Sequence, residues 1–138
     1  MGGRIVVHSL DQARAALAAA SSLKRKVVLA SASGAGCYAG SPWFKSLAAL
    51  AQASYPEAQM ESVLDCGAEA GVALAALRMG FKRVGFSGGD NARAKLEEIA
   101  RALGATIESG GAPDALDLRD GKDAEASCRS YLAGGTLA

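Results

Sequence analysis

Short β-branched segments alternate with alanine-rich amphipathic segments, and this alternation predicts an α/β fold built from repeated βα units. Segments typical of strands begin near residues 5, 27, 60, 81 and 105. Their spacing of roughly 20–30 residues matches the length of a βα unit. A segment typical of a helix follows each of the first four strands. We therefore expect a mostly parallel sheet of four or five strands, flanked by helices and joined by right-handed crossovers.

The first repeat contains a strand at 5–7 and a helix that begins after Ser9. Ser9 and Gln12 have the spacing of a capping box, in which the hydroxyl accepts a hydrogen bond from the amide three residues later. Apolar residues then recur at helical spacing, so one face of this helix is expected to pack on the sheet. The basic run 24–26 falls where this helix should end, and cations there complement the helix dipole.

The later repeats follow the same pattern and carry their own start and stop signals. We expect strands at 27–30, 60–65, 81–86 and 105–108, and helices at 41–54, 68–79 and 90–103. Pro42 is suited to the first turn of a helix, and Asp90 is a typical N-cap. Gly80 and Gly104 suit the left-handed conformation that often follows a helix end.

A chain of 138 residues is long enough for one domain, which we place at 1–109. The segment 110–138 is expected to hold a Gly/Pro-containing linker and a short C-terminal helix that packs on the same domain. The spacing of Ala124, Cys128, Tyr131 and Leu132 predicts that helix, whereas residues 134–138 are expected to fray.

Two architectures fit the strand pattern. The favoured one is an open sheet of the flavodoxin or Rossmann type, and the alternative is half of a (βα)8 barrel. Central strands of an open parallel sheet are apolar on both faces, yet Val84 and Phe86 share one face of their strand while Arg83 and Gly85 share the other. The segment 64–87, in which Asp-Cys-Gly precedes an alanine-rich helix and Phe-Lys-Arg-Val-Gly-Phe-Ser-Gly, also resembles a βα unit of TIM-barrel enzymes.

Composition excludes several classes of partner and cofactor. The net charge of +1 argues against a nucleic-acid-binding protein, and no segment is long and apolar enough to span a membrane. Three widely spaced cysteines and one histidine form no metal-ligand pattern, so we expect no bound metal and free thiols in the cytoplasm. The string Gly34-Ala-Gly-Cys-Tyr-Ala39 matches GxGxxA, but Gly40 and Pro42 interrupt the helix start that a dinucleotide site needs, so we expect no such cofactor.

Ligands of parallel α/β folds bind beyond the carboxyl ends of the strands. Four segments are expected there: 8–9, 31–41, 65–67 and 87–91. Two of them are rich in Gly and Ser and lead into helices, a pattern that favours binding of a phosphate or carboxylate group. The candidate ligand-binding residues are Ser33, Gly34, Gly36, Ser87, Gly88 and Gly89.

Asp65 and Cys66 are the candidate catalytic residues. A thiol near a helix start can lose its proton more readily, although a neighbouring carboxylate opposes this. His8 is the available base, and a strand order of 2-1-3 would bring it near Cys66. The ordinary alternatives are that Asp65 caps the next helix and that Cys66 is a small buried hydrophobic residue.

Three functional hypotheses follow from these residues. The first is binding of a small phosphorylated or carboxylate metabolite at the strand ends, and whether a reaction follows stays open. The second is a non-catalytic homodimeric interaction module that uses the uncharged loop 31–41 and the aromatic residues near it, namely Tyr38, Trp43 and Phe44. The third is a thiol enzyme that uses Cys66.

Overall fold

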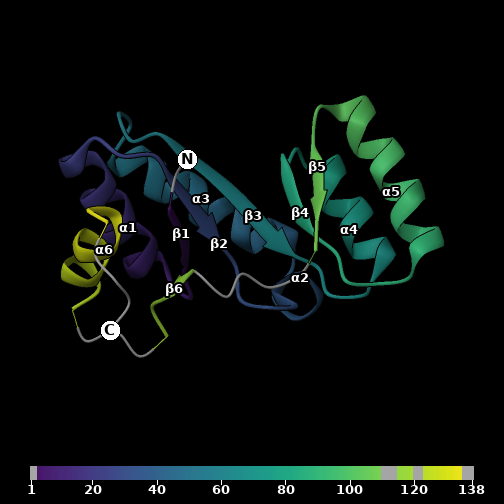
Figure 1. Cartoon of the computed structure of the whole chain (residues 1–138), viewed down its shortest axis with the longest axis horizontal. Helices are drawn as coiled ribbons and strands as arrows, with labels where there is room; N and C mark the ends of the chain where they lie inside the picture. The colour runs from purple at the N-terminus through teal and green to yellow at the C-terminus, as the bar shows by residue number, and fades with distance from the viewer. Residues whose placement is uncertain (1–2, 110–114, 120–122, 135–138) are drawn as a thin grey trace. The chain divides into compact units, whose positions relative to one another are not determined.

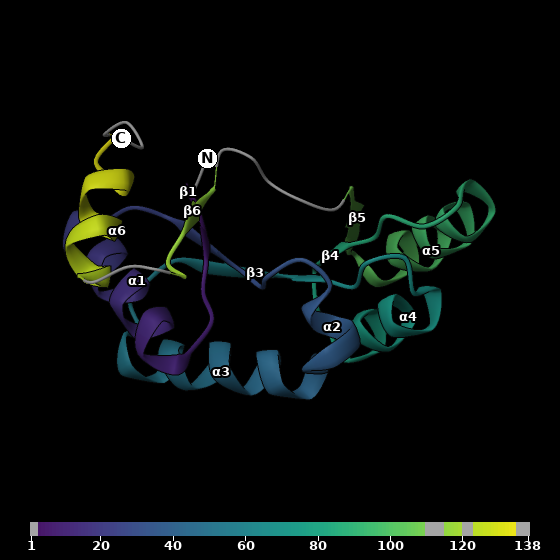
Figure 2. The same cartoon turned by 90° about the horizontal axis from the view of Figure 1, so that it is seen from below.

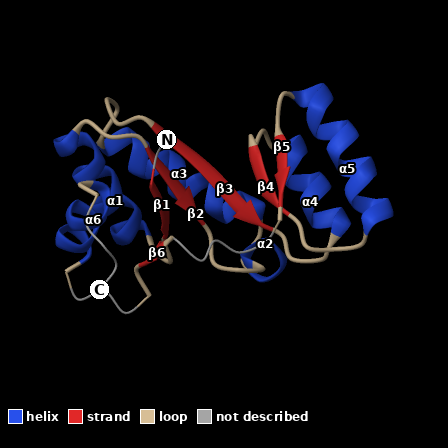
Figure 3. Ribbon diagram, in the orientation of Figure 1, coloured by secondary structure: helices blue, strands red, loops and turns tan. Residues whose placement is uncertain are grey.

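A six-stranded parallel sheet forms the centre of the computed structural model, which describes residues 3–109, 115–119 and 123–134 (Figure 3). The sheet is open, as predicted, with β5 and β6 as its two edges. The strands are β1 (Gly3–Val6), β2 (Val27–Ala30), β3 (Met60–Asp65), β4 (Arg83–Gly85), β5 (Thr106–Glu108) and β6 (Leu116–Asp117). The helices are α1 (Leu10–Leu23), α2 (Ala35–Tyr38), α3 (Ser41–Ser54), α4 (Ala70–Arg78), α5 (Asp90–Leu103) and α6 (Ala124–Leu132).

The strand order is β5-β4-β3-β2-β1-β6 (Figure 1). Strands β1 to β5 are therefore neighbours in the order of the sequence, and the order reverses where β6 pairs with the other edge of β1. The 2-1-3 order considered for His8 and Cys66 is wrong, because β2 stands between β1 and β3.

Two elements were missed by the sequence interpretation. The short helix α2 lies inside the segment 31–41, which was expected to be a loop throughout. The two-residue strand β6 pairs with β1, with Ile5 opposite Leu116 and Val6 opposite Asp117. Two residues give too short a pattern for an alternation of burial to be recognised. The predicted linker at 109–113 falls outside the described residues apart from Ser109, and residues 135–138 also fall outside them.

The chain divides into two compact units. Unit 1 comprises Met1–Ala30, Ser46–Glu61 and Ala112–Ala138, and unit 2 comprises Ser31–Lys45 and Ser62–Gly111. The expectation of one domain at 1–109 stays a prediction.

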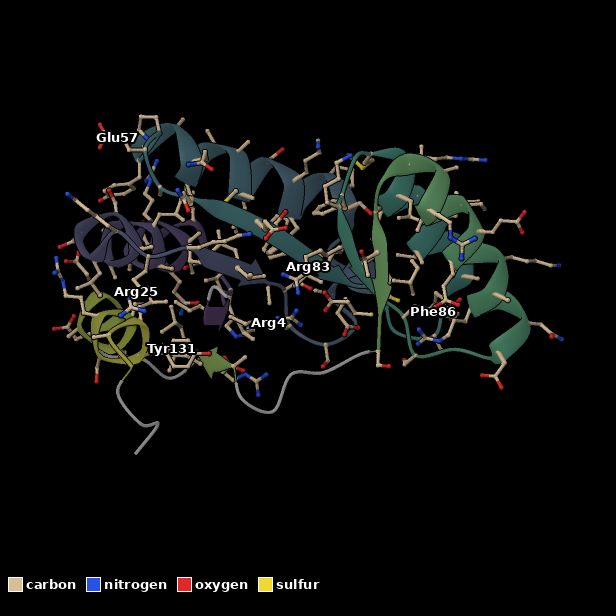
Figure 4. All side chains as sticks on the ribbon, turned by 45° about the horizontal axis from the view of Figure 1, so that its top comes forward. Arg4, Arg25, Glu57, Arg83, Phe86 and Tyr131 are labelled. Carbon is tan, nitrogen blue, oxygen red and sulfur yellow. The ribbon has the colours of Figure 1, made fainter. Side chains whose placement is uncertain are left out.

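In unit 1, α1 and α6 lie side by side (Figures 1 and 2). Small buried side chains of α1 permit this close packing, namely Ala13, Ala16, Ala19 and Ala20. At β1, a side chain at Gly3 would come within 2.7 Å of the Tyr131 ring, and the Arg4 amide donates to the Tyr131 hydroxyl at 3.3 Å (Figure 4). The α6 helix predicted from residue spacing is confirmed, and Cys128 and Leu132 are buried on it.

The start of α1 forms as predicted. The Ser9 hydroxyl accepts a hydrogen bond from the Gln12 amide at 3.2 Å. The Gln12 side chain accepts from the amide of His8 at 2.7 Å and donates to the carbonyl of Leu118 at 2.8 Å. Gln12 therefore joins the turn before α1 to the residue that follows β6.

In unit 2, α4 and α5 lie side by side next to β4 and β5 (Figure 1). Val84 and Phe86 are fully buried and Ser87 is exposed, as the predicted alternation requires, but Gly85 is buried although it was placed on the face of Ser87. Within the described part of the chain, no helix combines the length and the apolar character needed to cross a bilayer.

Candidate functional site

The carboxylate of Asp65 joins two segments of unit 2 at the end of β3. Its Oδ1 accepts hydrogen bonds from the amides of Gly34 and Gly67, both at 2.9 Å. One donor belongs to the segment that follows β2, and the other to the turn that follows β3. Asp65 thus holds together two of the segments that the sequence placed at the carboxyl ends of the strands.

Ser31 completes this network and was not singled out by the sequence interpretation. Its buried hydroxyl accepts from the Asp65 amide at 2.9 Å, and its own amide donates to the carbonyl of Val63 at 3.1 Å. Its position directly after a fully buried strand was the available signal. A serine there can bond the neighbouring strand with both its side chain and its backbone.

Two glycines let the backbone approach the network closely. A methyl group at Gly36 would lie 3.1 Å from the Cys66 sulfur and 3.2 Å from the Asp65 carbonyl oxygen. At Gly85, which is paired with Asp65 in the sheet, it would lie 3.1 Å from the Asp65 carboxylate. Gly36 is buried, so its position explains close packing better than direct contact with a ligand. Ser33, another predicted ligand-binding residue, is exposed.

The segment 87–89 adjoins the turn after β3. The Ser87 amide donates to the carbonyl of Gly67 at 2.8 Å, and a methyl group at Gly88 would clash with the Phe86 ring, which Figure 4 labels. A methyl group at Gly89, in contrast, would meet only open space. The structure thus gathers Gly34, Asp65, Gly67 and Ser87 at one edge of unit 2, which we call the β3–β4 rim.

Gly89, not Asp90, is the N-cap residue of α5. The helix begins at Asp90, and its N-cap residue Gly89 has no side chain with which to cap the first amides. Asp90 therefore lies one residue too late to serve as the predicted N-cap. The backbone of Gly89 is extended, with φ −68° and ψ 161°. The first amides of a helix point out of its end and carry a partial positive charge, which makes an uncapped start suitable for an anion.

The environment of Cys66 opposes the predicted role as the nucleophile of a thiol enzyme. The side chain is fully buried, and burial together with the nearby charge of Asp65 raises the pKa of the thiol to about 12. A high pKa leaves almost no thiolate at neutral pH. The neighbouring thiol of Cys37 is exposed and donates to the carbonyl of Cys66 at 3.1 Å.

His8 lies in unit 1 and pairs with an acid that the sequence interpretation did not consider. Its Nε2 is 2.7 Å from Oδ1 of Asp117, the last residue of β6. The same oxygen accepts a hydrogen bond from the Arg119 amide at 2.8 Å. The hypothesis that paired His8 with Cys66 depended on the wrong strand order, and the observed partner of His8 is Asp117.

The aromatic cluster is divided between core and surface. Phe44 is fully buried and stacks on Phe81 with ring centroids 6.2 Å apart. Trp43, whose ring centroid is 5.8 Å from that of Phe44, is 39% exposed. Core packing therefore accounts for Phe44, while Trp43 presents apolar surface to solvent.

A cavity of about 310 Å³ lies in unit 1, away from the predicted ligand-binding residues. Among its lining residues are Lys24, Arg25 and Glu57 (Figure 4 labels the last two). These residues precede β2 and β3, and so lie at the amino ends of the strands. Parallel α/β folds place their ligands at the carboxyl ends, so this cavity is not our candidate site. Among the described residues, no group of three or more His, Cys, Asp and Glu side chains is placed to hold a metal ion.

Comparison with known proteins gives one partial similarity of interest. The chain is 30% identical over 116 residues to a fructose-bisphosphate aldolase of Xanthobacter flavus. The similarity covers 74% of this chain and 33% of the aldolase, so the chain spans about a third of that relative's length. No protein-family profile matches the sequence.

Proposed function

We propose that the β3–β4 rim binds the phosphate or carboxylate group of a small metabolite. The observation that carries this proposal is the Asp65 network. Its carboxylate accepts hydrogen bonds from the amide of Gly34, in the segment after β2, and from the amide of Gly67, in the turn after β3. A network of this kind holds the rim in one arrangement before a ligand arrives, which lowers the entropic cost of binding. The adjacent start of α5 supplies amides without a side-chain cap.

A phosphorylated sugar is the preferred ligand class within this proposal. The partially similar relative is named for a sugar bisphosphate, and the chain matches a third of its length. This similarity is compatible with a phosphate-binding rim and makes fructose 1,6-bisphosphate the first probe. Binding of inorganic phosphate would show that the phosphate group is recognised without the sugar. Binding of succinate would show that a carboxylate group is recognised.

The test is titration of the ¹⁵N-labelled protein with each probe, followed by amide chemical shifts. We expect saturable shifts at Gly34, Gly67 and Gly89, and none at Gly104, which lies at the other end of α5. Rim amides that do not respond to any of the three probes would exclude the proposal.

Two substitutions at Gly89 make a matched pair for this titration. Gly89→Pro removes one amide, and the observed φ of −68° already suits proline. Gly89→Ala keeps the amide and has room for its methyl group. We expect phosphate to bind Gly89→Pro about tenfold more weakly than Gly89→Ala, because a hydrogen bond to a charged group contributes about 1.5–3 kcal/mol. Equal affinities would show that this amide does not contact the anion.

Asp90 supplies a test with the opposite sign. This exposed carboxylate lies in the first turn of α5, where its charge repels an anion. We expect Asp90→Asn to strengthen phosphate binding about two- to fivefold, the size of a charge effect at a helix end. Weaker binding by this variant would place the anion elsewhere.

Self-association is a second candidate function, and the exposure of Trp43 favours it. Its indole is 39% exposed and lies within the stretch 27–44, which carries no charge. Tryptophan is one of the residues enriched at interfaces between proteins. Sedimentation velocity of the wild type and Trp43→Ser tests this: a dimer that weakens in the variant supports it, and a strict monomer at high concentration excludes it.

A further inference from the structure

Two of the three cysteines lie next to each other at the β3–β4 rim, although 29 residues separate them in the sequence. The Cys37 sulfur is 3.1 Å from the carbonyl oxygen of Cys66. The contact is therefore between the thiol of one cysteine and the backbone of the other.

Glycines on both sides of the pair keep the space between the two segments free of side chains. A methyl group at Gly36 would lie 3.1 Å from the Cys66 sulfur, and one at Gly67 would lie 3.7 Å from the Cys37 sulfur. Each sulfur thus lies beside the residue adjacent to the other cysteine. A disulfide needs its two α-carbons within about 7 Å of each other. Here each cysteine sulfur lies within 4 Å of the β-carbon position of the other cysteine's neighbour, which places the two residues close together.

We propose that Cys37 and Cys66 are a modification site, at which a peroxide oxidant produces a reversible intramolecular disulfide. In the first step the Cys37 sulfur attacks hydrogen peroxide, the O–O bond breaks, and Cys37 becomes a sulfenic acid as one water leaves. In the second step the Cys66 sulfur attacks the sulfenic sulfur, the S–O bond breaks, and a second water leaves. Two thiols and one peroxide give one disulfide and two waters.

The order of these steps follows from the surroundings of each thiol. Cys37 is exposed and can meet a dissolved oxidant. Cys66 is fully buried, and burial raises the pKa of its thiol to about 12, so it is protected from direct oxidation. Once Cys37 is oxidised, the short distance between the two segments compensates for the low reactivity of Cys66.

The cross-link would fasten the same two segments that Asp65 holds by hydrogen bonds. Residue 37 belongs to the segment that contains Gly34, and residue 66 belongs to the turn that contains Gly67. Oxidation would therefore add a covalent link between these two segments, and a dithiol reductant would remove it by restoring both thiols.

The experiment treats the full-length native chain with hydrogen peroxide and maps its cysteines by tryptic digestion and mass spectrometry without reduction. Cleavage after Lys26, Lys45 and Arg78 leaves Cys37 in peptide 27–45 and Cys66 in peptide 46–78. We expect these two peptides to appear linked, with a mass two hydrogens below their sum, while free thiols fall from three to one. Dithiothreitol should restore all three.

Variants and a denatured sample supply the controls. Cys128→Ser should form the link as the wild type does, because Cys128 is buried in unit 1. Cys37→Ser should lose no thiol under the same treatment. In urea, links that include Cys128 should become common, which would show that the native pairing depends on the fold.

Two outcomes would overturn the proposal. One is conversion of Cys37 to sulfinic acid while the Cys66 thiol survives. The other is a Cys37 disulfide between two chains. Neither outcome depends on ligand binding, so the result also separates this inference from the proposed function.

Discussion

An aspartate ends β3 in unit 2, and another aspartate ends β6 in unit 1, yet the two carboxylates have different kinds of partner. Asp65 accepts hydrogen bonds from two backbone amides, those of Gly34 and Gly67. The Oδ1 of Asp117 lies 2.7 Å from Nε2 of His8 and also accepts a hydrogen bond from the Arg119 amide. The first carboxylate thus organises loops through their backbone, and the second connects the edge strand β6 to the side chain of His8.

The difference teaches that position at a strand end does not by itself define the role of an acid. Backbone amides keep nearly fixed positions in the fold, so a carboxylate bound to two of them ties together the segments that carry them. The contact between Asp117 and His8 joins two side chains instead, and the Asp117 side chain is 42% exposed. We expect substitutions to separate these two roles clearly.

The largest effect is expected at Asp65. Asp65→Ala removes the acceptor of two amides, and each hydrogen bond to a charged group contributes about 1.5–3 kcal/mol. We expect the free energy of unfolding to fall by about 3 kcal/mol, as measured by urea denaturation. Asp65→Asn keeps one acceptor oxygen and should lose about half as much. Wild-type stability for the alanine variant would mean that the Asp65 network is not important for the fold.

Gly36 should show the next largest effect. Its added methyl group in Gly36→Ala would press on the Cys66 sulfur and the Asp65 carbonyl, and overpacking of this kind costs about 1–3 kcal/mol. Gly71→Ala is the matched control, because Gly71 lies in α4 with open space around it. We expect this control substitution to raise the free energy of unfolding by about 0.5–1 kcal/mol. If urea denaturation shows that both substitutions change the free energy of unfolding in the same direction, the close packing at Gly36 does not limit stability.

The smallest effect is expected at Asp117, and it should depend on pH. Burial disfavours the carboxylate, but the His8 and Arg119 hydrogen bonds and charges outweigh burial and lower the pKa of Asp117 below its usual range. A lowered folded-state pKa stabilises the protein above the unfolded-state pKa, and this contribution is lost as pH falls through the folded-state pKa. Asp117→Asn should therefore lower the free energy of unfolding by less than about 1 kcal/mol at neutral pH.

Urea denaturation of the wild type and Asp117→Asn between pH 7 and pH 3 measures this dependence. The difference between them should begin to shrink below about pH 4, where the unfolded chain starts to protonate Asp117, and should vanish once the pH has fallen through the lowered folded-state pKa. A difference that stays constant over this range would show that the charge of Asp117 is not what holds β6.

Local patterns in the sequence determined most of the repeated units. The Ser9 cap of α1, the full length of β3 and the glycine that ends α5 all form where they were expected. Each of these depends on residues close together in the chain, so hydrogen-bonding and hydrophobic patterns are sufficient to predict them. The expectation that residues 34, 65 and 87 meet at one edge also followed from parallel strands alone.

Only the tertiary structure decided which groups become partners. Nothing near Asp117 in the sequence points to His8, and nothing near Cys37 points to Cys66, because these contacts join residues 109 and 29 positions apart. The order of the strands, the pairing of β6 with β1 and the burial of Ser31 likewise depend on how separate repeats pack. Local propensities act over a few residues, whereas these pairings depend on the free energy of the whole packed arrangement.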